Sequence, residues 1–242
     1  MEFPTEVKQI ILKLQQAGFE AYIVGGCVRD LLLGRKPKDW DVTTNAKPEE
    51  IQEIFPKSFY ENKFFTVGVM TDSTDLSLKI IEVTTFRSEA KYTDKRHPDE
   101  VKPAKSLNED LARRDFTINA IAIQILTRDG VRYQIIDPFG GQKDLKNKII
   151  RTVGNPEERF NEDALRMMRA IRIATELKFK IETNTGEAIK KHAGLLRMIA
   201  KERIAEELRK IIMTPYADKG IELLQKYGLL RYILPELEEG IG

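Results

Sequence analysis

The sequence changes character near residue 150, and this change restricts the possible folds more than any other feature. In residues 1–148, short runs rich in β-branched and aromatic residues alternate with short helical patterns. In residues 149–242, nearly every segment repeats its apolar residues with helical spacing. We therefore expect an α/β domain at 1–148 and an all-α segment at 149–242.

Start and stop signals divide both regions into short elements. In the first region the predicted elements are a helix at 6–17, a strand at 21–24, a helix at 28–33, a strand at 39–43, a helix from Pro48, paired strands at 65–71 and 78–86, a helix from Leu107 and a hairpin around Asp129-Gly130. The polar stretch 87–105 is predicted to be one long loop. Beyond Pro156 the predicted helices are 156–176, 184–194, 199–212 and 216–227, with a short one after them.

The composition excludes several classes of protein. One cysteine, Cys27, cannot form an internal disulfide, and two histidines add too few ligands for a zinc site. No apolar run approaches the roughly 20 residues of a membrane span, and the N-terminus has no secretory signal pattern. We expect a cytoplasmic protein with no membrane partner. The formal net charge of +2 neither requires nor forbids a nucleic-acid partner.

Asp39-Trp40-Asp41 is the most informative tripeptide of the chain. Alternate residues of a strand point to the same face, so the two carboxylates are expected to lie together. Because like charges repel, a hard divalent cation such as magnesium is the usual reason to hold them close. Taken alone, the pattern is more often a solvated strand end. Glu82, an acid inside the apolar run 78–86, favours a third ligand beside the pair.

Gly25-Gly26 follows a predicted strand and precedes a predicted helix. Glycines at such a turn let the backbone approach phosphate oxygens, and the first N–H groups of the helix supply donors. Arg29, one turn later, can add a charged and forked contact to phosphate. A strand, a glycine pair and a helix form a common arrangement, so the turn by itself is weak support for a phosphate site.

Taken together, five ordered motifs over about residues 20–240 resemble the class II tRNA nucleotidyltransferases (CCA-adding enzymes) and the related bacterial poly(A) polymerases. They are Gly25-Gly26-Cys27-Val28-Arg29-Asp30 with Gly34 and Asp39-Trp40-Asp41, then Arg113-Arg114-Asp115-Phe116-Thr117-Ile118-Asn119-Ala120, Asp137-Pro138-Phe139-Gly140-Gly141, Glu162-Asp163-Ala164-Leu165-Arg166 and Glu202-Arg203-Ile204. The resemblance implies an α+β fold. A nucleotidyltransferase head with a mixed or antiparallel sheet and flanking helices (1–148) would precede a helical neck and the start of a body domain (149–242).

The resemblance also implies roles for individual residues. Arg114, Asp115 and Asn119 belong to the motif that contacts ribose and triphosphate, and Asp163 with Arg166 belongs to the motif that selects the base.

The chemistry of an aspartate and an arginine suits cytosine and adenine, since each shows an exocyclic amino donor beside a ring-nitrogen acceptor. Uracil and guanine present the reverse pattern. On the predicted helix 156–176, Asp163 and Arg166 would share a face, with Arg169 and Arg172 extending the row. A surface ion pair is the ordinary alternative for two such residues.

In the same family, the region that corresponds to 87–105 is a flexible loop that assists the switch from C to A addition. In this chain it is long and polar, with Asp94, Lys95 and Arg96, which favours a full CCA adder over a CC-adding form. An unspecialised surface loop is the alternative.

We therefore expect a magnesium-dependent enzyme, with two ions, that adds C and A to the tRNA 3′ end from CTP and ATP. Asp39 and Asp41 would hold the metal and Glu82 would support them. The alternatives are a poly(A) polymerase, a CC- or A-adding enzyme of the same family, or a non-catalytic RNA-binding fragment. Family members usually continue into further helical domains beyond the position of Gly242. We expect either a piece of a longer protein or a minimal natural form, with weakened tRNA affinity.

Overall fold

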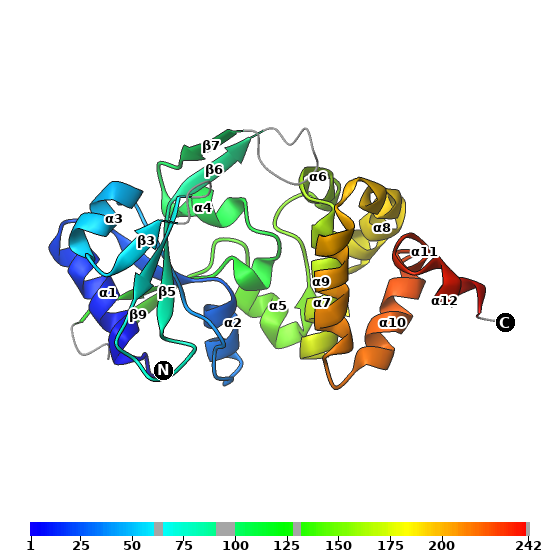
Figure 1. The fold of residues 1–242 in the computed structure, drawn as a ribbon, viewed down its shortest axis with the longest axis horizontal. Helices are drawn as coiled ribbons and strands as arrows, with labels where there is room; N and C mark the ends of the chain where they lie inside the picture. The colour runs from blue at the N-terminus through cyan, green and yellow to red at the C-terminus, as the bar shows by residue number, and fades with distance from the viewer. Residues whose placement is uncertain (61–64, 91–99, 128–131, 241–242) are drawn as a thin grey trace. The chain divides into compact units, whose positions relative to one another are not determined.

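The computed structural model of the chain describes residues 1–60, 65–90, 100–127 and 132–240 (Figure 1). The chain divides into two compact units. The first unit consists of residues 1–89, 101–114 and 118–142, and the second of residues 90–100, 115–117 and 143–242. Each unit contains its own set of buried hydrophobic side chains.

The first unit is built on a seven-stranded sheet with the strand order β3-β4-β5-β2-β1-β8-β9. Only β2 and β5 pair in parallel, and every other neighbouring pair is antiparallel. The expected mixed sheet is thus confirmed. The strands are β1 (Ala21–Val24), β2 (Asp41–Thr44), β3 (Ser58–Tyr60), β4 (Thr66–Met70), β5 (Ile80–Thr85), β8 (Ala122–Ile125) and β9 (Tyr133–Ile136).

Four short helices accompany this sheet: α1 (Thr5–Gln16), α2 (Gly26–Leu32), α3 (Pro48–Ile54) and α4 (Leu107–Ala112). Helix α1 buries Val7, Ile10, Ile11 and Leu14, the stripe that helical spacing predicts. Helices α1 and α3 contact each other on one side of the sheet (Figure 1). On β5, Ile81, Val83 and Thr85 are buried while Glu82 is exposed, so the two faces of this strand differ.

The predicted long loop at 87–105 is wrong at both of its ends. Residues Arg87–Ala90 (β6) and Glu100–Pro103 (β7) form a two-stranded sheet. Alternation of apolar and polar residues appears only where one face of a strand is buried, so these polar strands carried no such signal. Asp94, Lys95 and Arg96 lie outside the described residues, as does the Asp129-Gly130 turn, although β8 and β9 pair as that turn predicts.

The second unit is mainly helical, as predicted. Its elements are α5 (Gly141–Asn147, which begins in the first unit), β10 (Ile149–Ile150), α6 (Pro156–Glu162), α7 (Leu165–Leu177), β11 (Lys180–Ile181), α8 (Thr183–His192), the 3-10 helix η3 (Ala193–Met198), α9 (Lys201–Ile212), α10 (Ala217–Lys226), α11 (Leu230–Ile233) and α12 (Pro235–Glu239). No helix in the described part of the chain is both long and apolar enough to cross a bilayer.

The single helix predicted at 156–176 is wrong, because α6 ends before Asp163 and α7 begins at Leu165. Asp163 has φ −134° and ψ 105°, an extended conformation, and its Oδ1 accepts a hydrogen bond from the Leu165 N–H at 3.0 Å. Aspartate favours such capping geometry over a helix interior. The break was not visible in the sequence because both helices bury apolar residues in the same unit, Phe160 on α6 and Met167 on α7. The spacing of apolar residues therefore continues across the break.

Candidate functional site

Two of the predicted acids meet across the parallel pair of strands in the first unit. Asp41 on β2 is the register partner of Glu82 on β5, and the Glu82 N–H donates to the Trp40 carbonyl at 3.2 Å. Residues paired in register point to the same face of a sheet. The sheet therefore brings Asp41 and Glu82 together from positions 41 residues apart in the chain.

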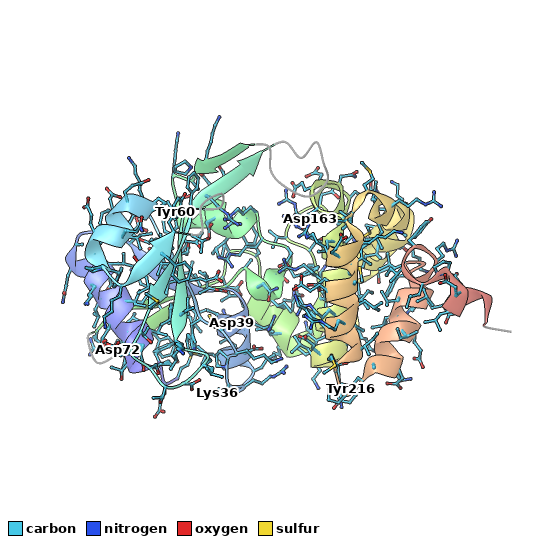
Figure 2. All side chains as sticks on the ribbon, in the orientation of Figure 1. Lys36, Asp39, Tyr60, Asp72, Asp163 and Tyr216 are labelled. Atoms are coloured by element: carbon cyan, nitrogen blue, oxygen red, sulfur yellow. The ribbon has the colours of Figure 1, made fainter. Side chains whose placement is uncertain are left out.

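Asp39 lies outside the strand, in the connection between α2 and β2 (Figure 2). The strand predicted at 39–43 in fact begins at Asp41, which pairs with Val24, the last residue of β1. Pairing stops at this point because β1 ends at the Gly25 turn. The prediction that Asp39 and Asp41 are alternate residues of one strand is therefore wrong, because only Asp41 belongs to β2.

The site concentrates negative charge. Burial raises the pKa of Asp41 to about 7, and the neighbouring charges of Glu82 and Asp39 add to this rise, while Arg114 opposes it. Carboxylate oxygens with unfavourable mutual repulsion are a donor set that suits a hard divalent cation. Within the residues that the structure describes, no group of three or more His, Cys, Asp or Glu side chains is arranged to hold a metal ion. The triad of Asp39, Asp41 and Glu82 as ligands stays a prediction.

The turn at Gly25 is closed tightly against these groups. Gly25 has φ 85° and ψ −143°, a conformation that side chains rarely adopt. A Cβ at this position would lie 3.0 Å from Asp41 Oδ2 and 3.1 Å from Arg114 Nη1. A carboxylate, a guanidinium and a glycine backbone thus converge at the start of α2. The binding of nucleotide by Gly25 and Arg114 stays a prediction.

Arg29 and Asn119 are also brought together in the first unit. Arg29 Nη1 donates to Asn119 Oδ1 at 2.9 Å, and its Nε and Nη2 donate to the two carboxylate oxygens of Asp30 at 3.1 and 3.2 Å. These contacts fix the plane of the guanidinium next to Gly26, whose added Cβ would lie 3.6 Å from Arg29 Nη2. The guanidinium is therefore held in one orientation by the protein itself.

In the second unit, Asp163 occupies the junction between α6 and α7 (Figure 2). Burial raises the pKa of its carboxyl group, and this effect outweighs the opposing influence of Arg203, the Leu165 N–H, Arg166 and Arg169. The carboxylate is thus partly withdrawn from water and surrounded by cations.

The three arginines of the predicted row are each paired with an acid of the second unit. Arg166 Nη1 lies 2.7 Å from Glu162 Oε2, and Arg169 Nη2 lies 2.8 Å from Asp115 Oδ2. Asp115 therefore meets Arg169, whereas Arg114 and Asn119 lie in the first unit.

Arg172 is held by two acids. Its Nε lies 2.8 Å from Glu207 Oε2, and its Nη1 lies 3.3 Å from Glu176 Oε1. Because Glu207 is buried on α9, this contact ties α7 to α9. The geometry gives Arg172 a structural task, and its predicted contact with nucleotide is untested.

Sequence reasoning left two charged residues out of the predicted site. Asp110 is fully buried and lies 2.8 Å from Arg113 Nη2 and 3.3 Å from Arg114 Nη2. Its spacing of three and four residues before two arginines was a usable signal. Arg203 has a buried Nη1 with no hydrogen-bond partner among the described residues, and it opposes the rise in the pKa of Asp163. The motif Glu202-Arg203-Ile204 marked its position without a chemical reason.

A cavity of about 660 Å³ lies elsewhere in the first unit. It is lined by α1, by residues 55–57 and by residues 69–73, and none of the predicted site residues lines it. The convergence of charged groups at Asp41, Gly25 and Arg114 is the stronger indication of a functional site, because these groups have the chemistry to bind phosphate and metal.

Comparison with known proteins finds relatives that match nearly the whole chain. A family model described as the poly A polymerase head domain matches residues 21–151, and one described as the probable RNA and SrmB-binding site of polymerase A matches residues 178–241. A CCA-adding enzyme of Anoxybacillus flavithermus is 48% identical over 230 residues, which cover 94% of this chain and 55% of that protein. The chain spans about half the length of the curated relatives it matches.

Solved structures with a similar fold include CCA-adding enzymes and a tRNA nucleotidyltransferase. The Bacillus stearothermophilus CCA-adding enzyme in complex with CTP has a TM-score of 0.82 and 44% identity, covering 94% of this chain and 53% of that one. A tRNA nucleotidyltransferase complexed with a primer tRNA and an incoming ATP analog has a TM-score of 0.75 and 33% identity, covering 94% and 62%. This chain therefore belongs to the nucleotidyltransferase family that contains the poly A polymerase head domain and the CCA-adding enzymes, as its motifs indicated.

Proposed function

We propose that the chain carries the catalytic part of a tRNA nucleotidyltransferase that adds C and A to the tRNA 3′ end from CTP and ATP. The observation that supports this most is the convergence of Asp41, Glu82, Gly25 and Arg114 in the first unit. The names of the relatives, which span the same motifs, point to the same reaction. We take residues 1–148 as the catalytic head and residues 149–242 as the neck with the start of a body, acting in the cytoplasm where tRNA is used.

In this reaction the terminal ribose hydroxyl of the tRNA attacks the α-phosphorus of the incoming nucleotide. The bond between the α-phosphorus and the oxygen that bridges to the β-phosphorus breaks, pyrophosphate leaves, and the hydroxyl proton passes to solvent. Asp39, Asp41 and Glu82 would hold magnesium, with two ions as the expected number. When bound, magnesium supplies positive charge that neutralises the triphosphate and lowers the pKa of a hydroxyl ligand. Only the carboxylate donor chemistry of this chain supports that part of the proposal.

The remaining head residues bind and orient the triphosphate. Gly25-Gly26 lets the backbone approach phosphate oxygens, and Arg114 offers charged donors on the same side. Arg29, held by Asp30 and Asn119, orients the sugar and phosphates together with Asn119. Preorganised donors of this kind cost no rearrangement when the nucleotide binds.

In the second unit, Asp163 and Arg166 select the base. The carboxylate accepts a hydrogen bond from the exocyclic amino group of cytosine or adenine, and the guanidinium donates to the adjacent ring nitrogen. Glu162 holds Arg166 in place for this contact, because Glu162 Oε2 lies 2.7 Å from Arg166 Nη1. Asp163 lies between two helices in an extended conformation, so its carboxylate is not part of a helix surface. Asp115 acts through Arg169, which contributes positive charge near the base-selecting pair. Arg172, at the end of the same row, supports these residues by holding α7 against α9. UTP and GTP would leave buried polar groups mispaired, which is costly.

Incubation with tRNA lacking its 3′ end and each labelled nucleotide in turn, with and without magnesium, tests this function. Addition of C and then A followed by a halt, dependent on magnesium, is the expected result. Long runs of A would indicate a poly(A) polymerase, which the description of the head-domain model also allows. C alone or A alone would indicate a partial-activity enzyme. RNA binding without incorporation under any condition would contradict the enzymatic proposal.

A further inference from the structure

Asp110 sits at a point where four parts of the first unit meet. Its side chain is fully buried on α4. Oδ1 accepts from Arg113 Nη2 at 2.8 Å and from the Arg87 N–H at 3.3 Å, where β6 begins. Oδ2 accepts from Thr43 Oγ1 at 3.3 Å and from Arg114 Nη2 at 3.3 Å. One carboxylate thus joins β2, β6 and both arginines of the Arg113-Arg114 pair.

The donors around Asp110 fix the carboxylate from several directions. Arg113 Nε also donates to the Arg87 carbonyl at 3.1 Å, so the first residue of β6 is held at both its N–H and its C=O. Thr43 lies two residues after Asp41 on β2, and its hydroxyl hydrogen is shared with the Thr84 carbonyl at 3.2 Å. The position of the carboxylate is therefore set by the sheet and by α4 before Arg114 is considered.

Arg114 uses its two terminal nitrogens in different directions. Nη2 donates to Asp110, and Nη1 lies beside the Gly25 turn, 3.1 Å from where a Cβ would stand. The buried Nε has no hydrogen-bond partner among the residues that the structure describes. The hydrogen bond to Asp110 thus sets the direction in which Nη1 points toward Asp41 and the turn.

We propose that Asp110 is a positioning residue, which holds the guanidinium of Arg114 against the Gly25 turn so that it binds the triphosphate of the incoming nucleotide. This inference rests on the proposed function for the nature of the ligand, a nucleoside triphosphate. Asp110 itself does not touch the nucleotide. A long flexible arginine loses much of its freedom on binding, and a prearranged partner removes that entropic cost from the binding step.

A double-mutant cycle on CTP affinity separates this role from general stabilisation. We would measure the Kd for CTP with magnesium and without tRNA, by calorimetry, for the full chain and for Arg114→Ala, Asp110→Asn and the double variant. Arg114→Ala is expected to weaken binding by about 100-fold, as for loss of one charged donor. Asp110→Asn is expected to weaken it by about tenfold alone but by less than about threefold in the Arg114→Ala background.

Asp144→Asn is the matched control. Asp144 is a buried aspartate of the second unit that also accepts from a threonine hydroxyl, Thr117 Oγ1 at 2.7 Å, and from an arginine, Arg151 Nε at 3.1 Å. It should lower the Tm as Asp110→Asn does, yet its effect on the Kd should be the same with and without Arg114. If Asp110→Asn does not fold, Thr43→Val removes one donor to the same carboxylate and should show a smaller effect that also disappears in the Arg114→Ala background.

Equal effects of Asp110→Asn, or of Thr43→Val, with and without Arg114 would overturn the inference, as would an unchanged Kd. Wild-type protein that binds CTP but transfers no nucleotide would contradict the proposed function while the cycle still decides the role of Asp110. Wild-type protein that binds no CTP would contradict both.

Discussion

The two carboxylate regions of this molecule differ in the charges that surround them. Asp41 in the first unit is half-buried beside Glu82 and near Asp39, with Arg114 as the cation that opposes them. Asp163 in the second unit is also half-buried, yet Arg203, Arg166 and Arg169 all favour its ionised form. In the first region, three carboxylates face one nearby cation, so negative charge is in excess. In the second region, one carboxylate is surrounded by three arginines.

This difference shows what each region is suited to bind. A cluster of carboxylates suits a cation, and without a cation it lowers the stability of the folded state, because like charges repel there. A carboxylate among arginines needs no cation and keeps a fixed acceptor and fixed donors, which suits the edge of an uncharged base. The same residue type therefore serves two chemistries, and its neighbours decide which.

Asp41→Asn should show the largest effect, and it tests whether the carboxylates of the first unit bind a cation. Loss of a metal-binding charge should reduce nucleotide incorporation by about 10³-fold or more, about 4 kcal/mol. The Tm should rise, because a carboxyl whose folded pKa is raised destabilises the folded state at pH values above its unfolded pKa. Incorporation assays and thermal unfolding at pH 8 measure the two effects. Exposed Asp72→Asn is the control, and a lower Tm for Asp41→Asn would contradict the electrostatic account.

Arg172→Met should show the next largest effect, on stability. It leaves the buried Glu207 and the partly buried Glu176 without their guanidinium, and we expect a loss of about 2–4 kcal/mol in the free energy of unfolding. Urea denaturation measures this loss. The ratio of C and A to U and G incorporation should not change at a temperature where the variant is folded. A changed ratio would instead show that Arg172 belongs to the base-selecting group.

Asp163→Ala should have a smaller effect, on selectivity. Removing the acceptor for the exocyclic amino group should lower kcat/KM for CTP and ATP by about 10- to 100-fold, or about 1.4–2.7 kcal/mol. UTP and GTP should be affected much less, so the four nucleotides become more alike. Parallel steady-state assays with all four nucleotides measure this change. An equal loss for all four would assign Asp163 to folding instead of base selection.

Lys219→Met should have the smallest effect on Tm and activity. It shows how little the loss of an exposed charge outside both carboxylate regions changes these quantities. Lys219 and Glu222 form an exposed ion pair on α10 at 2.9 Å, far less buried than either carboxylate region. Exposed pairs contribute little because water and salt screen them. The Tm and the incorporation rate should match those of the wild type within error. A clear loss of activity would point to an RNA contact on α10.

The local elements were largely readable from the sequence. Periodicity predicted α1 and its buried stripe, and turn residues predicted the ends of β1 and the β8–β9 pair. The break at Asp163 and the strands β6 and β7 were missed. The extended backbone of Asp163 depends on a capping contact, and β6 and β7 depend on pairing with each other. Neither feature leaves a pattern of apolar residues in the sequence.

The functional groups themselves are visible in the order of residues along the chain: acids at 39, 41 and 82, the glycine turn, and the ordered arginines and acids of the motifs. Which of these groups come into contact depends on how the chain folds. The parallel pairing of β2 with β5 places Asp41 beside Glu82, and the packing of α4 places Asp110 between Thr43 and Arg114. Such contacts arise from strand order and burial over long stretches of chain, which local residue preferences do not encode.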